Sequence, residues 1–193
     1  MPTIQNSTPA CCVLLTTTAP TAGFIDASCY DYFLLRMKNH RHIYRLQIHA
    51  YALLPQAVWL LLTPGYPNSI TKFCTALNRN YSAYFNQRYR RNIQVWRNKP
   101  RVTLMPHNEL TLECQKFIER QPLEQALTHY PGCYPWSSFC PTAFGEPHPL
   151  LSQHEITKQF ITKHKLKGYR EFIIMPFEQA RLNYLQTRFV GEQ

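Results

Sequence analysis

The sequence lacks an apolar run long enough to cross a membrane. Its longest candidate, residues 50–62, is interrupted by Pro55 and Gln56, whereas a spanning helix needs roughly 20 mostly apolar residues. The first residues also lack the basic and apolar regions of a secretory signal. We therefore expect a cytoplasmic protein that has no membrane partner.

Paired cysteine motifs are also missing, although the chain has seven cysteines. An odd number without any Cys-x-x-Cys spacing argues against a disulfide framework and against a zinc ribbon. Most of these cysteines are expected to be small, buried hydrophobic side chains. With 193 residues, of which 45% are apolar, the chain can form one domain with a full core and an appendage.

Acidic residues are absent from a long central stretch, because none lies between Asp31 and Glu109. These 77 residues contain twelve Lys and Arg, in a chain whose net charge is +10. An ordinary surface mixes both signs, so this excess favours a polyanionic partner. Aromatic residues alternate with arginines in NRNYSAYFNQRYRRNIQVWRNK, which is typical of stacking on unpaired bases beside phosphate contacts. About half of these rings are expected to be core.

We predict that single-stranded or stem-loop DNA binds to the basic residues of this stretch and to one tryptophan. The predicted DNA-binding residues are Arg79, Arg88, Arg90, Arg91, Trp96, Arg97, Lys99 and Arg101.

The hydrophobic periodicity predicts an alternation of strands and helices. Strands are expected over 11–18, 44–54 and 57–63, with a strand or extended arm over 92–105. Helices are expected from Asp26 to about 40, from a capping Ser69 to about Arg88, and from a capping Asn108 to a stop at Pro122. This order predicts an α+β domain with helices packed on an antiparallel sheet, in the ferredoxin-like manner. We assign it to residues 1–145 and expect a helical C-terminal extension over 146–193.

Five segments then carry a resemblance to a known family. They are IHAYALLPQAVWLLLTP, ITKFCTALNRNYSAYFNQRY, QVWRNKPR, CQKFIERQPLEQAL and YPGCYPWSSF. In this order, from about Cys12 to Phe139, the chain resembles the REP-associated branch of the single-tyrosine, HUH-type transposases. The resemblance implies a ferredoxin-like domain that cuts single-stranded DNA beside a stem-loop. It also implies Mg²⁺ or Mn²⁺ held by a His-hydrophobic-His pair, and a tyrosine that attacks the phosphate.

This chain departs from the family at each reactive position. The paired histidines correspond to Ala57 and Trp59, which cannot ligate a hard cation. The nucleophilic tyrosine corresponds to Phe117, and a metal-binding Asn corresponds to Gln121. The only His-x-His spacing is that of His40 and His42, which we interpret as exposed or phosphate-facing. We predict no metal, no cofactor and no catalytic residue.

The most consistent interpretation is a transposase-like DNA-binding protein without catalytic activity. One alternative is an active DNA-cleaving and DNA-joining transposase with rearranged ligands, in which Tyr130 or Tyr134 replaces the lost nucleophile. Another is an RNA-binding or protein-interaction module. The sequence leaves the oligomeric state open.

Overall fold

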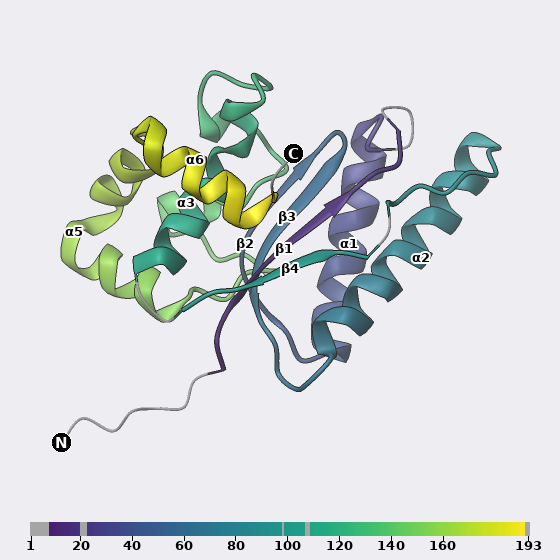
Figure 1. Ribbon diagram of the computed structural model, residues 1–193, viewed down its shortest axis with the longest axis horizontal. Coiled ribbons are helices and arrows are strands. Elements are labelled where there is room, and N and C mark those ends of the chain that lie inside the picture. Colours follow the sequence, from purple (N-terminus) through teal and green to yellow (C-terminus); the bar gives the residue numbers. More distant parts are fainter. Residues whose placement is uncertain (1–7, 20–22, 98, 107–108, 192–193) are drawn as a thin grey trace.

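The chain forms an antiparallel sheet with helices packed on both of its faces (Figure 1). The computed structural model describes residues 8–19, 23–97, 99–106 and 109–191. The strands are β1 (Cys11–Thr16), β2 (Gln47–Leu54), β3 (Ala57–Thr63) and β4 (Arg101–Leu104). The helices are α1 (Ala27–Ile43), α2 (Ser69–Tyr89), α3 (Glu109–Glu124), α4 (Phe139–Phe144), α5 (Glu155–Ile174) and α6 (Gln179–Phe189), with a 3-10 turn, η2, at Pro131–Cys133.

The strand order of the sheet is β2-β3-β1-β4, and each neighbouring pair is antiparallel. Each of the two helical connections, α1 and α2, links strands that are not neighbours, which gives the ferredoxin-like arrangement. The α+β fold class expected from the sequence is therefore confirmed. The two apolar runs around Pro55 and Gln56 form the hairpin of β2 and β3, in which Leu54 pairs with Ala57.

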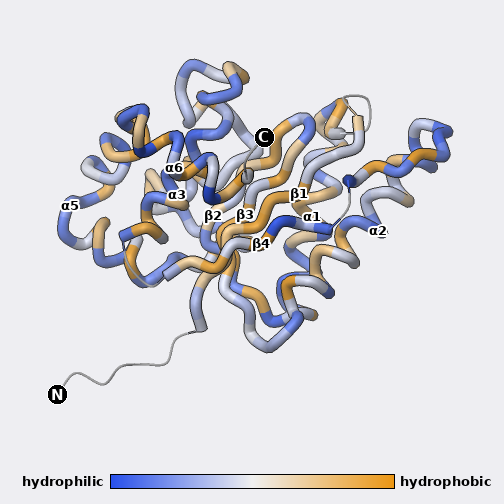
Figure 2. Tube along the Cα trace, in the orientation of Figure 1, coloured by the Kyte–Doolittle hydropathy of each residue, from blue (hydrophilic) through white to orange (hydrophobic). Residues whose placement is uncertain are grey.

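Alternation along the strands divides the core between the two faces of the sheet. Val58, Leu60 and Leu62 belong to one cluster, which also contains the buried residues of α1 and α2. Trp59 and Leu61 belong to another cluster, together with buried residues of α3 and α6. Figure 1 shows α1 and α2 on one side of the sheet, with α3 and α6 on the other. Figure 2 shows that the central strands are largely hydrophobic.

The cap geometry confirms one expected helix start, at Asp26, and corrects another, at Ser69. Asp26 caps α1, because its carboxylate accepts a hydrogen bond from the Cys29 amide at 3.1 Å. The prediction that Ser69 caps α2 is wrong. Ser69 is the first helical residue, and the cap position belongs to Asn68, whose φ of 63° lies in the left-handed region that Asn tolerates.

Helix α3 does not stop at Pro122, as we had predicted, but continues to Glu124. Proline lacks an amide proton, yet its fixed φ is compatible with helical backbone. The chain turns only afterwards, where the Leu127 amide donates to the Pro122 carbonyl at 2.9 Å. The expected cap at Asn108 lies outside the described residues.

The C-terminal part is helical, as expected. Helix α5 is interrupted at Lys165, whose φ is 62°, and α6 packs its buried Leu185 and Phe189 on the sheet. The segment before α5 covers the outer edge of β2, where the Ser152 amide donates to the Ile48 carbonyl at 2.7 Å. The division of the chain at residue 145 remains a prediction.

The described part of the chain contains no helix that is both long and apolar enough to span a membrane. All seven cysteines are unpaired. Five of them are buried, as the sequence predicted: Cys11, Cys12, Cys29, Cys74 and Cys114.

Candidate functional site

Strand β3 lies between β1 and β2, so its residues are fixed on both sides by the sheet. Ala57 pairs with Thr16 of β1 and with Leu54 of β2, directly after the hairpin turn. Trp59 follows two residues later and lies on the same face. That face is covered by α3 and α6. The two positions where the resemblance predicts metal-binding histidines are therefore held rigidly against α3.

The Trp59 indole is packed between elements that are far apart in the sequence. Its ring centroid lies 5.3 Å from that of Phe117 of α3, with an interplanar angle of 80°. Phe117 in turn contacts Phe189 of α6, also at 5.3 Å. Trp59, Phe117 and Phe189 are 3%, 2% and 1% exposed. These edge-to-face contacts make the three rings one buried cluster, which we call the Trp59 cluster.

The residues at the reactive positions do not fit a divalent metal. Ala57 has no ligand atom, and the indole of Trp59 offers only an N–H donor. Gln121 is 7% exposed, and its amide nitrogen donates to the Phe117 carbonyl at 3.2 Å. Its amide oxygen would be a single neutral ligand, whereas Mg²⁺ needs near-octahedral oxygen coordination. No reaction step through a metal follows from this arrangement.

A pocket with a volume of about 440 Å³ lies beside Ala57. Its lining contains no carboxylate, imidazole or thiol. The lining residues are Thr16, Thr17, Pro55, Gln56, Ala57, Arg97, Gln125 and Leu127. The pocket is therefore polar and carries one positive side chain, Arg97, whose Nε donates to the Thr17 carbonyl at 3.1 Å.

Neither of the alternative tyrosines lines this pocket. The hydroxyl of Tyr134 donates to the Leu53 carbonyl at 2.6 Å, and burial raises the pKa of Tyr134 above its usual range. A phenol that is held protonated in this way is a poor nucleophile. The ring of Tyr130 packs against Phe139, with centroids 5.9 Å apart. That one of these tyrosines replaces the lost nucleophile remains an untested alternative.

The remaining histidines do not converge on a metal site. No group of three His, Cys, Asp or Glu suited to a metal occurs among the residues that the structure describes. His40 and His42 lie in the last turn of α1. His40 is half-buried rather than exposed, and its Nε2 lies 2.7 Å from the Asn80 amide nitrogen. Burial and the neighbouring Arg36 and Arg79 lower the pKa of His40.

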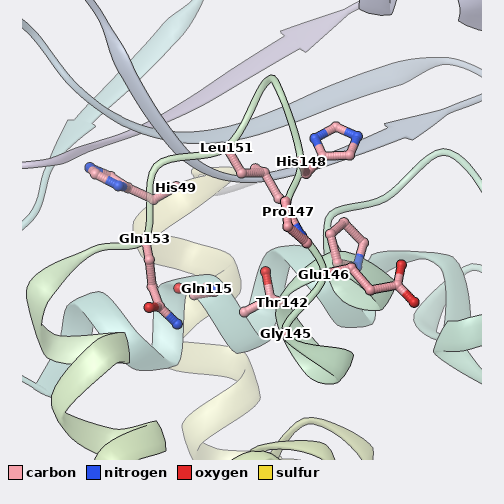
Figure 3. Close-up of a pocket in the computed structure, with 10 residues that line it drawn as sticks. His49, Gln115, Thr142, Gly145, Glu146, Pro147, His148, Leu151 and Gln153 are labelled. Atoms are coloured by element: carbon pink, nitrogen blue, oxygen red, sulfur yellow. The ribbon is translucent and has the colours of Figure 1, made fainter.

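A pocket of about 260 Å³ lies where residues 141–153 cover β2 (Figure 3). His49 lines it, but both of its ring nitrogens have partners, with Nδ1 2.6 Å from the Ser152 carbonyl and Nε2 2.9 Å from the Thr63 hydroxyl. Burial lowers the pKa of His49 to about 4. Figure 3 shows the side chains of His49, Glu146 and His148 pointing in different directions. This pocket therefore has no converging set of reactive groups.

Glu119, two residues after Phe117, is the centre of a buried hydrogen-bond network that the sequence did not reveal. Its carboxylate accepts hydrogen bonds from the Tyr169 hydroxyl at 2.7 Å, the Ser138 hydroxyl at 2.8 Å and the Gln115 amide at 3.2 Å. Despite these donors, complete burial raises the pKa of Glu119 to about 7. The network joins α3 to α5, and the Tyr51 amide of β2 donates to Ser138. The network therefore links core segments that are distant in the sequence.

The basic residues predicted to bind DNA lie along α2, the segment after it, and β4. Seven of them are exposed: Arg79, Arg88, Arg90, Arg91, Arg97, Lys99 and Arg101. Arg88 is 3.5 Å from the Asp26 carboxylate, in an exposed ion pair, which is worth little in water. The surface is thus strongly positive, and that these seven residues contact DNA remains a prediction.

Trp96 is buried, unlike the seven cations. The prediction that it stacks on DNA bases is therefore wrong. Its side chain is 4% exposed and packs in the core with Phe33 and Tyr81, at centroid distances of 5.7 and 5.4 Å. Tyr81 and Phe85 are also buried, while Tyr84 and Tyr89 are half-buried. Interleaving with arginines did not distinguish core rings from surface rings, because the apolar stripe of α2 supplies most of them.

No protein-family model and no curated protein matches the chain. Solved structures do. One is a REP-associated tyrosine transposase bound to a REP hairpin, with a TM-score of 0.61 and 10% identity over 80% of this chain and 93% of that one. The fold is that of a REP-associated tyrosine transposase. A candidate transposase from Deinococcus radiodurans R1 gives a TM-score of 0.44 and 16% identity, over 63% of this chain and 96% of that one. The expected resemblance is confirmed for the fold.

Proposed function

We propose that this protein binds single-stranded or hairpin DNA on a transposase-like scaffold and does not cut it. The observation that carries the proposal is the Trp59 cluster. Aromatic rings fill the place where the REP-associated transposase resemblance predicts metal-binding histidines and a nucleophilic tyrosine. The family chemistry needs a metal to polarise the phosphodiester and a phenol to displace the 3′ oxygen, and these side chains supply neither.

The DNA-binding half of the proposal is supported by charge and by the fold. Seven exposed cations lie between residues 79 and 101, and the sequence has no acidic residue between Asp31 and Glu109. The solved transposase of the same fold is bound to a REP hairpin. We transfer a hairpin ligand to this chain on those two grounds. Phosphate contacts give such binding its affinity without selecting a sequence.

Equilibrium binding of labelled DNA and RNA hairpins at several salt concentrations tests this function. If about five cations contact phosphates, log affinity falls against log salt with a slope of roughly −3.5 to −4.5. The DNA hairpin is expected to compete better than an RNA hairpin of the same sequence. An affinity that does not depend on salt, or preferential binding of RNA, would contradict the proposal and favour the RNA-binding or protein-interaction alternative.

A further inference from the structure

A groove runs between helix α2 and the edge strand β4. Its volume is about 860 Å³, and we call it the α2–β4 groove. Its lining residues are Thr71, Thr75, Asn78, Lys99, Pro100 and Val102. Thr71, Thr75 and Asn78 are four and three residues apart, so they form one face of the helix. The wall on α2 is therefore polar, and the opposite wall combines a cation with apolar surface.

The groove carries only positive charge. Lys99 is the charged residue of its lining, and the exposed Arg79 follows Asn78 on α2. Arg101 lies next to Val102 on β4 but faces the other side of the sheet, where its guanidinium donates to the Arg188 carbonyl of α6 at 3.4 Å. The side-chain amide oxygen of Asn78, Oδ1, is buried and has no hydrogen-bond partner among the described residues. This oxygen can only accept a hydrogen bond, so the NH₂ of the same side chain is the group that can donate to an anion. Hydroxyl, amide and ammonium groups in one groove are suited to phosphate oxygens.

A β-strand from another protein copy is the competing occupant, because β4 is an edge strand that, among the described residues, pairs with β1 alone. The charges argue against it. Lys99 and Arg101 of a second copy would approach the same cations in antiparallel pairing, and like charges across a strand pair are destabilising. Basic residues on an edge strand are a known means of preventing such pairing. The charge of the groove favours a polyanion instead.

We infer that the α2–β4 groove holds an unpaired DNA strand by its phosphates; this rests on the proposed function and specifies where the strand lies. From Thr71 to Asn78 the helix rises about 10 Å, so the polar wall is long enough to contact more than one phosphate of a strand. A concave, positively charged groove that follows the backbone is the usual form of a single-strand site. The lining contains no aromatic ring on which bases could stack. Contacts to phosphates alone carry no sequence information, so binding is expected to be independent of base sequence.

The test uses the full chain and an unstructured thymidine 15-mer, with a DNA hairpin measured in parallel. Thr75→Glu places a negative charge on the exposed helix wall, and Glu is a better helix former than Thr. Thr162→Glu makes the same change at an exposed position of α5. We expect Thr75→Glu to weaken 15-mer binding about tenfold at low salt, and Thr162→Glu to leave it unchanged. Lys99→Gln should reduce the salt slope by about 0.7.

The measurements distinguish a failure of the proposed DNA-binding function from a failure of the groove assignment. If the unmodified protein binds neither the hairpin nor the 15-mer, the proposed function fails and the groove assignment fails with it. If the hairpin binds but Thr75→Glu and Thr162→Glu bind the 15-mer equally, with circular dichroism spectra of folded protein, only the groove assignment is overturned. Covalent cross-linking of a photoreactive 15-mer to residues of the groove would support it independently.

Discussion

The ring of Trp59 on β3 meets the ring of Phe117 on α3 edge to face, with centroids 5.3 Å apart and planes at 80°. On the transposase-like fold these two positions are where the resemblance places a metal ligand and the nucleophile. Phe189 of helix α6 completes the Trp59 cluster by packing against Phe117. All three rings are buried and contribute to the stability of the core.

Replacing Trp59 by His is expected to destabilise the protein without creating a metal site. The change removes most of a buried indole and leaves a cavity, which costs about 3 kcal/mol. One imidazole beside Ala57 cannot hold a divalent ion in water. Urea unfolding and calorimetric titration with Mn²⁺ measure the two effects. Unchanged stability together with saturable Mn²⁺ binding would contradict the account, because it would show that the Trp59 ring neither stabilises the core nor prevents a metal from binding there.

Neutralising Arg79, Arg90 and Lys99 together, each by Gln, should weaken hairpin binding to a similar extent for unrelated sequences. These exposed cations are expected to contact phosphates, so the salt slope should fall by roughly 2. The matched control replaces the exposed Lys158, Lys163 and Lys167 of α5 by Gln, with the same change in net charge. Equal losses in both triple variants would mean that only net charge matters.

Sequence periodicity was sufficient to predict the sheet and its flanking helices, because apolar runs and helical stripes report burial directly. Periodicity did not predict burial where a side chain is covered by residues that are distant in the sequence. Trp96 was assigned to the surface, although Phe33 and Tyr81 enclose it. Phe189 was not recognised as part of the core, although the spacing of Leu182, Leu185 and Phe189 in α6 contains the signal. The Glu119 network joins segments about 50 residues apart, and no local pattern predicts it.

Glu119→Gln should change the pH dependence of stability. Burial raises the pKa of Glu119 from 4.5 to about 7, so between these values the folded state binds more protons than the unfolded state. The carboxyl therefore lowers stability progressively as pH rises through this window, by up to about 3 kcal/mol. The stability of Glu119→Gln relative to the unmodified protein should increase from pH 4.5 to 8.

Chemical unfolding of both proteins across this range measures the difference, and Glu171→Gln, at an exposed position, is the matched control. A difference that stays constant with pH would contradict the assignment of a titrating, buried Glu119. His49 titrates in the opposite sense, because its pKa is lowered to about 4, but it contributes equally to both proteins and cancels in the comparison.

Asp26→Ala should destabilise the protein by about 1 kcal/mol or somewhat more through loss of the α1 cap. The same carboxylate also accepts a hydrogen bond from the Tyr89 hydroxyl at 2.6 Å, which fastens the end of α2 to the start of α1. Asp26→Asn keeps a capping oxygen and should lose less. Thermal unfolding of the two variants compares them, and equal losses would mean that charge, not capping, dominates at this position.

Incubation of the unmodified protein with a labelled DNA hairpin and Mn²⁺, followed by a denaturing gel and mass spectrometry, tests the central claim most directly. The account predicts an intact hairpin that binds the protein under native conditions, with no cleaved product and no protein–DNA adduct. A covalent species that disappears when Tyr130 or Tyr134 is replaced by Phe would contradict it, because the chemistry would then have moved to another tyrosine.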